Sequence, residues 1–176
     1  MTPGLGAMLL IPAILLVQSS TQGEAQTPAQ APTQQGVRAQ YDWGYAGMDG
    51  EGSGTLSLLV EPSTGRVVAE LHGVGERLMF LSGDHSSGYR IQIPRQEIDK
   101  HCPTFASLPI PFLPQLGSTE ALYRLLSEGV GPGVKIRKRD KLGPVKFSYK
   151  GLDEHGKDVM VWMKRTRWEA IETKQQ

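Results

Sequence analysis

Residues 55–71, TLSLLV-EPSTG-RVVAEL, hold two short alternating runs on either side of a turn. In both runs every second residue is apolar, namely Leu56, Leu58 and Val60 before the turn and Val67, Ala69 and Leu71 after it. A period of two is typical of a strand with one buried face. Pro, Ser, Thr and Gly between two such runs favour a tight reversal of the chain. This stretch therefore predicts an antiparallel β-hairpin.

The same alternation extends outward from this hairpin in both directions. It predicts an opening strand over 38–45, a second hairpin with Leu78 and Phe80 before the turn at 82–88 and Tyr89, Ile91 and Ile93 after it, and a C-terminal meander carrying Val134 and Ile136, then Val145, Phe147 and Tyr149, then Val159, Val161 and Met163. Together these runs predict about eight strands.

The middle of the chain departs from the strand pattern. Leu108–Pro114 carries three prolines, which exclude both a helix and a central strand, so an extended apolar crossing is expected. Ser118 is then a suitable N-cap for a helix over Thr119–Glu128, and Gly129 is a suitable stop. The apolar face of this helix consists of Leu122, Leu125 and Leu126.

One helix of ten residues is only about 15 Å long and does not cover a sheet of this size. We therefore expect a mainly β fold, an antiparallel, strongly curved, unclosed half-barrel with the helix as a short lid. The inner face of the sheet would then leave an apolar ligand groove, lined by Leu58, Val60, Val67, Leu71, Phe80, Ile91, Ile93, Phe147 and Val161, with Leu122, Leu125 and Leu126 as the lid. Each of these residues also suits an ordinary sheet core.

The N-terminus has the pattern of an export signal. An apolar run over 7–17 is too short to span a bilayer and leads into a polar, small-residue stretch. We expect a signal peptide over 1–25 cleaved after Ala25, although Ala31 ends a second candidate site and no basic residue precedes the run. A disordered leader over 26–36, a single domain over 37–170 and a tail over 171–176 would follow, in a soluble, periplasmic protein.

The sequence has no phosphate-binding glycine loop, nucleophile elbow or HExxH pair, so a non-enzymatic protein without cofactor or metal is expected. Cys102 is the only cysteine of the 176 residues, which excludes an internal disulfide and favours a buried thiol.

Basic residues gather in the C-terminal meander, although the net charge of the chain is only +1. The candidate basic face consists of Lys135, Arg137, Arg139 and Lys146. Anionic lipid head groups or an acidic partner are one interpretation, and a solvated edge that resists aggregation is the other. Nucleic acid is disfavoured because no aromatic residues are interleaved at a recognition spacing.

The order of these elements resembles the bacterial lipoprotein-localisation (LolA/LolB-like) superfamily. The resemblance rests on Tyr89–Pro94, on Ser107–Pro111 leading to Leu122–Gly129, and on Leu142–Tyr149 followed by Val159–Met163. It covers most of residues 37–168 and is one of layout, without an invariant motif. The resemblance implies an unclosed half-barrel that holds acyl chains in an apolar cavity and performs no covalent chemistry.

Two functions follow as expectations. The first is a monomeric carrier that binds the acyl chains of a lipid or lipoprotein in the envelope, with peripheral membrane contact. The second is an envelope assembly or scaffold protein that docks a protein partner through aromatic residues of its first strand and through its basic meander. The residues for this second function are Tyr41, Trp43, Tyr45, Trp162 and Trp168.

Overall fold

The computed structural model describes residues 36–48, 50–114, 116–153 and 155–172. All of them lie in Pro32–Gln176, the second of two units into which the chain divides. They form nine strands, one α-helix and two short 3₁₀ turns: β1 (Gly36–Gly47), β2 (Gly50–Glu61), β3 (Arg66–His72), β4 (Arg77–Asp84), β5 (Gly88–Ile93), η1 (Pro94–Gln96), β6 (Ile98–Cys102), η2 (Phe105–Ser107), α1 (Thr119–Glu128), β7 (Lys135–Asp140), β8 (Gly143–Leu152) and β9 (Asp158–Ile171). The expected signal peptide lies outside the described residues, as does the expected leader except for Gly36, which begins β1.

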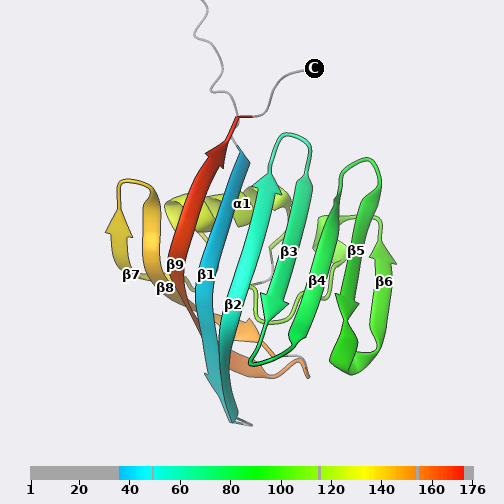
Figure 1. The fold of residues 1–176 in the computed structure, drawn as a ribbon, viewed down its shortest axis with the longest axis horizontal. Coiled ribbons are helices and arrows are strands. Elements are labelled where there is room, and N and C mark those ends of the chain that lie inside the picture. The colour runs from blue at the N-terminus through cyan, green and yellow to red at the C-terminus, as the bar shows by residue number, and fades with distance from the viewer. Residues whose placement is uncertain (1–35, 49, 115, 154, 173–176) are drawn as a thin grey trace, which may run out of the picture. The chain divides into compact units, whose positions relative to one another are not determined.

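The nine strands make one antiparallel sheet in the order β6-β5-β4-β3-β2-β1-β9-β8-β7 (Figure 1). The first and last strands pair at its centre, where β1 lies between β2 and β9. The sheet does not close, since β6 and β7 are edges. The predicted mainly β, unclosed half-barrel with one helix is confirmed, with nine strands in place of about eight.

This strand order dictates the path of the middle segment. The chain leaves the sheet at one edge, β6, and must reach the opposite edge, β7, so residues 103–114 and 116–134 cross one face. Helix α1 lies behind the sheet in the view of Figure 1 and packs on β2 and β8. The core lies between the sheet and this crossing segment. Within the described ranges, no helix is both long and apolar enough to cross a membrane.

Helix α1 has the predicted bounds. The Ser118 side chain accepts a hydrogen bond from the Ala121 backbone N–H at 3.2 Å, which satisfies one of the free donors of the first turn. Gly129 ends the helix in the left-handed conformation, with φ 73°. Leu122, Leu125 and Leu126 are each 0% exposed, so the apolar face of the helix is part of the core.

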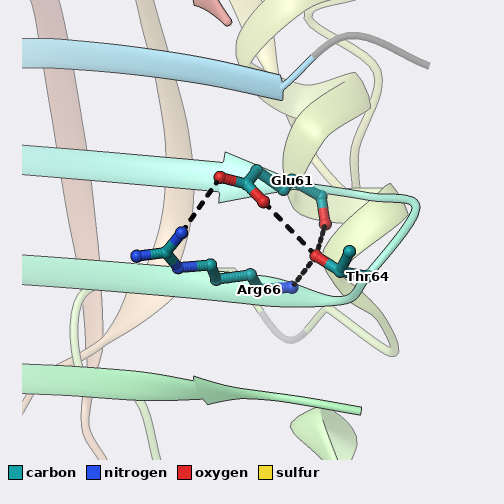
Figure 2. A network of polar contacts seen from close by, with 3 residues as sticks. All are labelled: Glu61, Thr64 and Arg66. Atoms are coloured by element: carbon teal, nitrogen blue, oxygen red, sulfur yellow. Dashed lines mark hydrogen bonds and ion pairs between the residues drawn. The ribbon is translucent and has the colours of Figure 1, made fainter. Parts of the chain in front are cut away.

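The turn between β2 and β3 is held by its own side chains (Figure 2). The Thr64 hydroxyl accepts the Arg66 backbone N–H at 3.2 Å and lies 3.4 Å from the Glu61 carbonyl, while the Arg66 guanidinium lies 3.4 Å from the Glu61 carboxylate. Gly65 has φ 69°, and a Cβ there would lie 2.1 Å from the His85 ring. The turn therefore requires glycine for conformation and for space.

Three sequence predictions about strands need correction. The edge strand β6 was not expected, because only Cys102 among its residues is buried and its polar positions hide the alternation. In β4 the buried residues are Met79 and Leu81, so Phe80 faces away from the core. Because Leu78–Leu81 are four consecutive apolar residues, the sequence allows either alternate pair to face the core. In the structure the inward pair is Met79 and Leu81, and the pairing of β3 with β4 shifts register beside His72. Strand β9 also continues through Ile171, into the expected tail.

Candidate functional site

A cavity lies where the crossing segment meets the ends of β5 and β8. Its volume is about 640 Å³, within the range of small-molecule sites. Its walls come from three regions far apart in sequence, and the lining residues are Ile93, Gln96, Ile98, Phe105, Ala106, Leu108, Pro109, Ile110, Pro111, Leu113, Pro114, Leu116, Gly117, Leu152, Asp153 and Gly156. We call this cavity the end pocket.

Apolar side chains dominate the described lining of the end pocket, and among the described residues Gln96 and Asp153 are the ones with polar side chains. The Asp153 carboxylate accepts the backbone N–H groups of His155 and Lys157, each at 2.8 Å. Desolvation acts to raise the pKa of Asp153, but these hydrogen bonds outweigh it and hold the pKa below its ordinary value. The carboxylate thus stays ionised and organises the β8–β9 turn at the side of the pocket.

The inner wall of the end pocket is the proline-rich segment, and Phe112 fastens this segment to the sheet. Its ring centroid lies 5.1 Å from that of Trp43 and 4.7 Å from that of Tyr45. Its backbone N–H donates to the Leu152 carbonyl at 2.7 Å, and its carbonyl accepts the Tyr149 hydroxyl at 2.8 Å. Phe112 has φ 61°, an uncommon conformation for a non-glycine residue, which these contacts maintain.

A smaller void lies on the other side of the same segment, over the centre of the sheet. It measures about 10 Å³, room for at most one water molecule. Pro111 and Leu113 line both this void and the end pocket. The segment is therefore a partition, and its displacement would join the end pocket to the inner face of the sheet.

The residues predicted to line the ligand groove have different places in the structure. Ile93 lines the end pocket, and Leu71 and Val161 line the small void. Side chains of the chain itself pack over the remaining inward residues, which are Leu58, Val60, Val67, Ile91 and Phe147, all at most 2% exposed. Phe80 belongs to the opposite face, where its ring lies under the Arg77 guanidinium at 5.6 Å.

The residues expected to form the lid, Leu122, Leu125 and Leu126, are fully buried in the core beneath α1 and do not line the end pocket. The side chains next to the end pocket come instead from the partition, whose Pro111 and Leu113 line it. Three closely spaced prolines with apolar residues between them were the sequence signal for it, but they did not show which face the segment covers.

The aromatic residues of the first strand, which were expected to form an exposed docking strip, are packed in or against the core. Tyr41 and Trp43 are 0% and 1% exposed, and the Trp43 indole N–H donates to the His72 carbonyl at 3.1 Å. The Tyr41 hydroxyl has no hydrogen-bond partner among the described residues. Burial raises its pKa above the ordinary value, although the positive charge of Arg165 acts to lower it. These rings are part of the core and are unavailable for docking.

The predicted basic residues divide into two groups. Lys135, Arg137 and Lys146 line an exposed hollow of about 440 Å³ on the outer face of β7–β9. Arg139 instead donates to the Glu128 carbonyl at the end of α1.

Within the described ranges, no group of three or more His, Cys, Asp or Glu residues is arranged to hold a metal ion. Comparison of the chain with protein-family models and with curated proteins gives no match.

Proposed function

We propose that this protein is a carrier that binds the acyl chain of a lipid or lipoprotein in the end pocket. The observation that carries the proposal is the pocket itself, a cavity of about 640 Å³ in which all but two of the described lining residues have non-polar side chains or none. Such a lining offers a hydrocarbon chain burial against apolar side chains. The proposed setting is the cell envelope, on the basis of the export pattern at residues 1–25.

The free energy of acyl-chain burial is sufficient for useful affinity. Each buried methylene contributes about 0.8 kcal/mol, so a chain of a dozen carbons contributes roughly 10 kcal/mol before the costs of association are subtracted. The partition would determine how much of a longer chain is accommodated, because moving Pro111 and Leu113 outward extends the site toward Leu71 and Val161.

The LolA/LolB-like relationship remains part of the proposal. Two features support it, the unclosed antiparallel sheet and the crossing segment that covers its inner face. In this chain the inner face is packed by its own side chains, and the cavity lies at one end. Acyl binding would therefore begin at the end pocket rather than along the centre of the sheet.

A fluorescent fatty-acyl probe provides the test. Ile110 is half-buried and lines the pocket, so Ile110→Asp places a carboxylate against the hydrocarbon without emptying the core. Desolvation of that charge should lower probe affinity at least tenfold. Val74→Asp is the matched control, because Val74 is 90% exposed in the β3–β4 turn, and it should bind the probe like the wild type.

A second variant removes space without adding charge. Gly117 lines the pocket, has an ordinary φ and would place a Cβ in open space, so Gly117→Phe should fold normally and fill part of the cavity. Circular dichroism must show a retained sheet in each variant. A folded wild type that takes up no probe of any chain length, or equal binding by all four proteins, would contradict the carrier.

A further inference from the structure

The outer face of the C-terminal meander concentrates positive charge. Three lysines lie directly opposite one another across three strands, since Lys138 of β7 pairs with Lys146 of β8, and Lys146 pairs with Lys164 of β9. All three are exposed. We call this outer surface the cationic face, and it comprises Lys135, Arg137, Lys138, Lys146, Lys150 and Lys164.

This arrangement is unfavourable for the sheet alone, because like charges directly opposite each other repel. Only one member of the row is compensated, Lys164, whose ammonium lies 3.6 Å from the Asp42 carboxylate. In the described part of the chain, no carboxylate lies within salt-bridge distance of Lys138 or Lys146. Local conflicts of this kind are expected at functional or strained sites, and an external anion would relieve this repulsion.

An exposed aromatic residue lies in the adjacent row of the same face. Trp162 is 44% exposed and lies flat against Gly44 of β1, where a Cβ would come within 2.2 Å of the indole. Met160 is 42% exposed. Both residues help to line the hollow of about 440 Å³, together with Lys135, Arg137, Lys146 and Lys164. An apolar centre is thus flanked by long cationic side chains of β7, β8 and β9.

We propose that the cationic face docks on the surface of a bilayer that contains anionic phospholipid. The charges complement lipid phosphates, and the central Trp162 and Met160 match the interfacial region, where indole rings and the stems of lysines are favoured. A polyanion without apolar groups would account for the lysines but would leave the exposed Trp162 and Met160 without a role. This surface lies on the opposite face of the sheet from the core, so the inference is independent of acyl binding in the end pocket.

Vesicle flotation with the full chain tests the inference. Phosphatidylcholine vesicles are compared with vesicles containing 30% phosphatidylglycerol. Every protein compared carries the same apolar run at 7–17, so this run does not distinguish the variants from the wild type. The wild type should bind the anionic vesicles more tightly, with affinity that falls as salt rises. Lys138→Glu and Lys146→Glu should each lower that affinity at least fivefold.

Lys100→Glu is the matched control, because it makes the same charge change at an exposed position on β6, at the other edge of the sheet. It should bind like the wild type. Trp162 adds a direct signal, a blue shift in its fluorescence on anionic vesicles that Trp162→Ala removes. Ile110→Asp should retain vesicle binding, which separates this inference from the carrier proposal.

Three results would overturn the inference. Equal binding to neutral and anionic vesicles would exclude recognition of charge. A loss of affinity in Lys100→Glu as large as that in Lys138→Glu and Lys146→Glu would show that net charge, and not the cationic face, determines binding. Binding to an acidic polypeptide such as polyglutamate without binding to anionic vesicles would assign the face to a protein partner instead.

Discussion

At the scale of single residues, Tyr149 connects the sheet to the partition of the end pocket. It is fully buried, and its hydroxyl donates to the Phe112 carbonyl at 2.8 Å. Tyr149→Phe removes this donor and should lower the free energy of unfolding by about 1–3 kcal/mol. Amide hydrogen exchange should quicken first over 108–113, because the segment loses one of its two backbone attachments to β8.

Tyr45→Phe is the control for this variant. Tyr45 also packs on Phe112, with ring centroids 4.7 Å apart, but no described residue hydrogen-bonds its hydroxyl. Its exchange pattern and stability should match the wild type. Equal effects of the two substitutions would show that ring packing, and not the Tyr149 hydroxyl, holds the partition.

The two core tyrosines also predict how stability depends on pH. Burial raises the pKa of Tyr41 and of Tyr149 above the ordinary value near 10. The unfolded chain then loses these protons first, so the stability contribution is complete below pH 10 and is lost as pH rises above it. Each tyrosine adds a slope of up to about 1.4 kcal/mol per pH unit, and Tyr149→Phe should remove its share. Urea unfolding between pH 9 and 11 measures the slopes, and parallel curves for both proteins would contradict this assignment.

At the scale of elements, helix α1 should behave as part of the core. Ser118→Ala removes the N-cap and should cost about 1 kcal/mol, whereas Leu125→Ala empties a fully buried position and should cost about 2–5 kcal/mol. Ser63→Ala, at an exposed turn position, should change stability by less than about 0.5 kcal/mol. Urea unfolding compares the three variants.

Hydrogen exchange distinguishes a core helix from a lid. Because the leucines of α1 belong to the same core as the strands, Leu125→Ala should quicken exchange in Thr119–Glu128 and in β8 together. Loss of protection confined to the helix would instead support the sequence-based interpretation of α1 as a lid.

At the scale of the whole molecule, we expect the chain to be exported and its signal peptide to be cleaved. The apolar run over 7–17 and the small residues that end at Ala25 predict a mature chain that begins near Gln26. Intact-mass measurement of the protein from the envelope fraction should show this start. Recovery of the chain from Met1 in the cytosol would contradict export and, with it, the proposed setting of the carrier.

Much of the fold was predictable because its signals are local. Helix α1 combines Ser118, one apolar face and Gly129 within twelve residues, and the β2–β3 hairpin combines two period-two runs with a glycine-containing turn. Such patterns depend on backbone geometry over a few residues. Strand β6 lacked any such signal, because an exposed edge strand has no buried face to create alternation.

The candidate sites depend instead on contacts between distant segments. The end pocket joins β5, the proline-rich segment and the β8–β9 turn, and no local pattern specifies that Ile93 and Leu152 line one cavity. The row of Lys138, Lys146 and Lys164 likewise exists only through strand register. Sequence alone was therefore sufficient for the class of fold, the hairpins and the helix, whereas pairing and packing of remote segments placed the pocket and the cationic face. The physical reason is that periodicity shows that one face of an element is buried, but not which partner covers it.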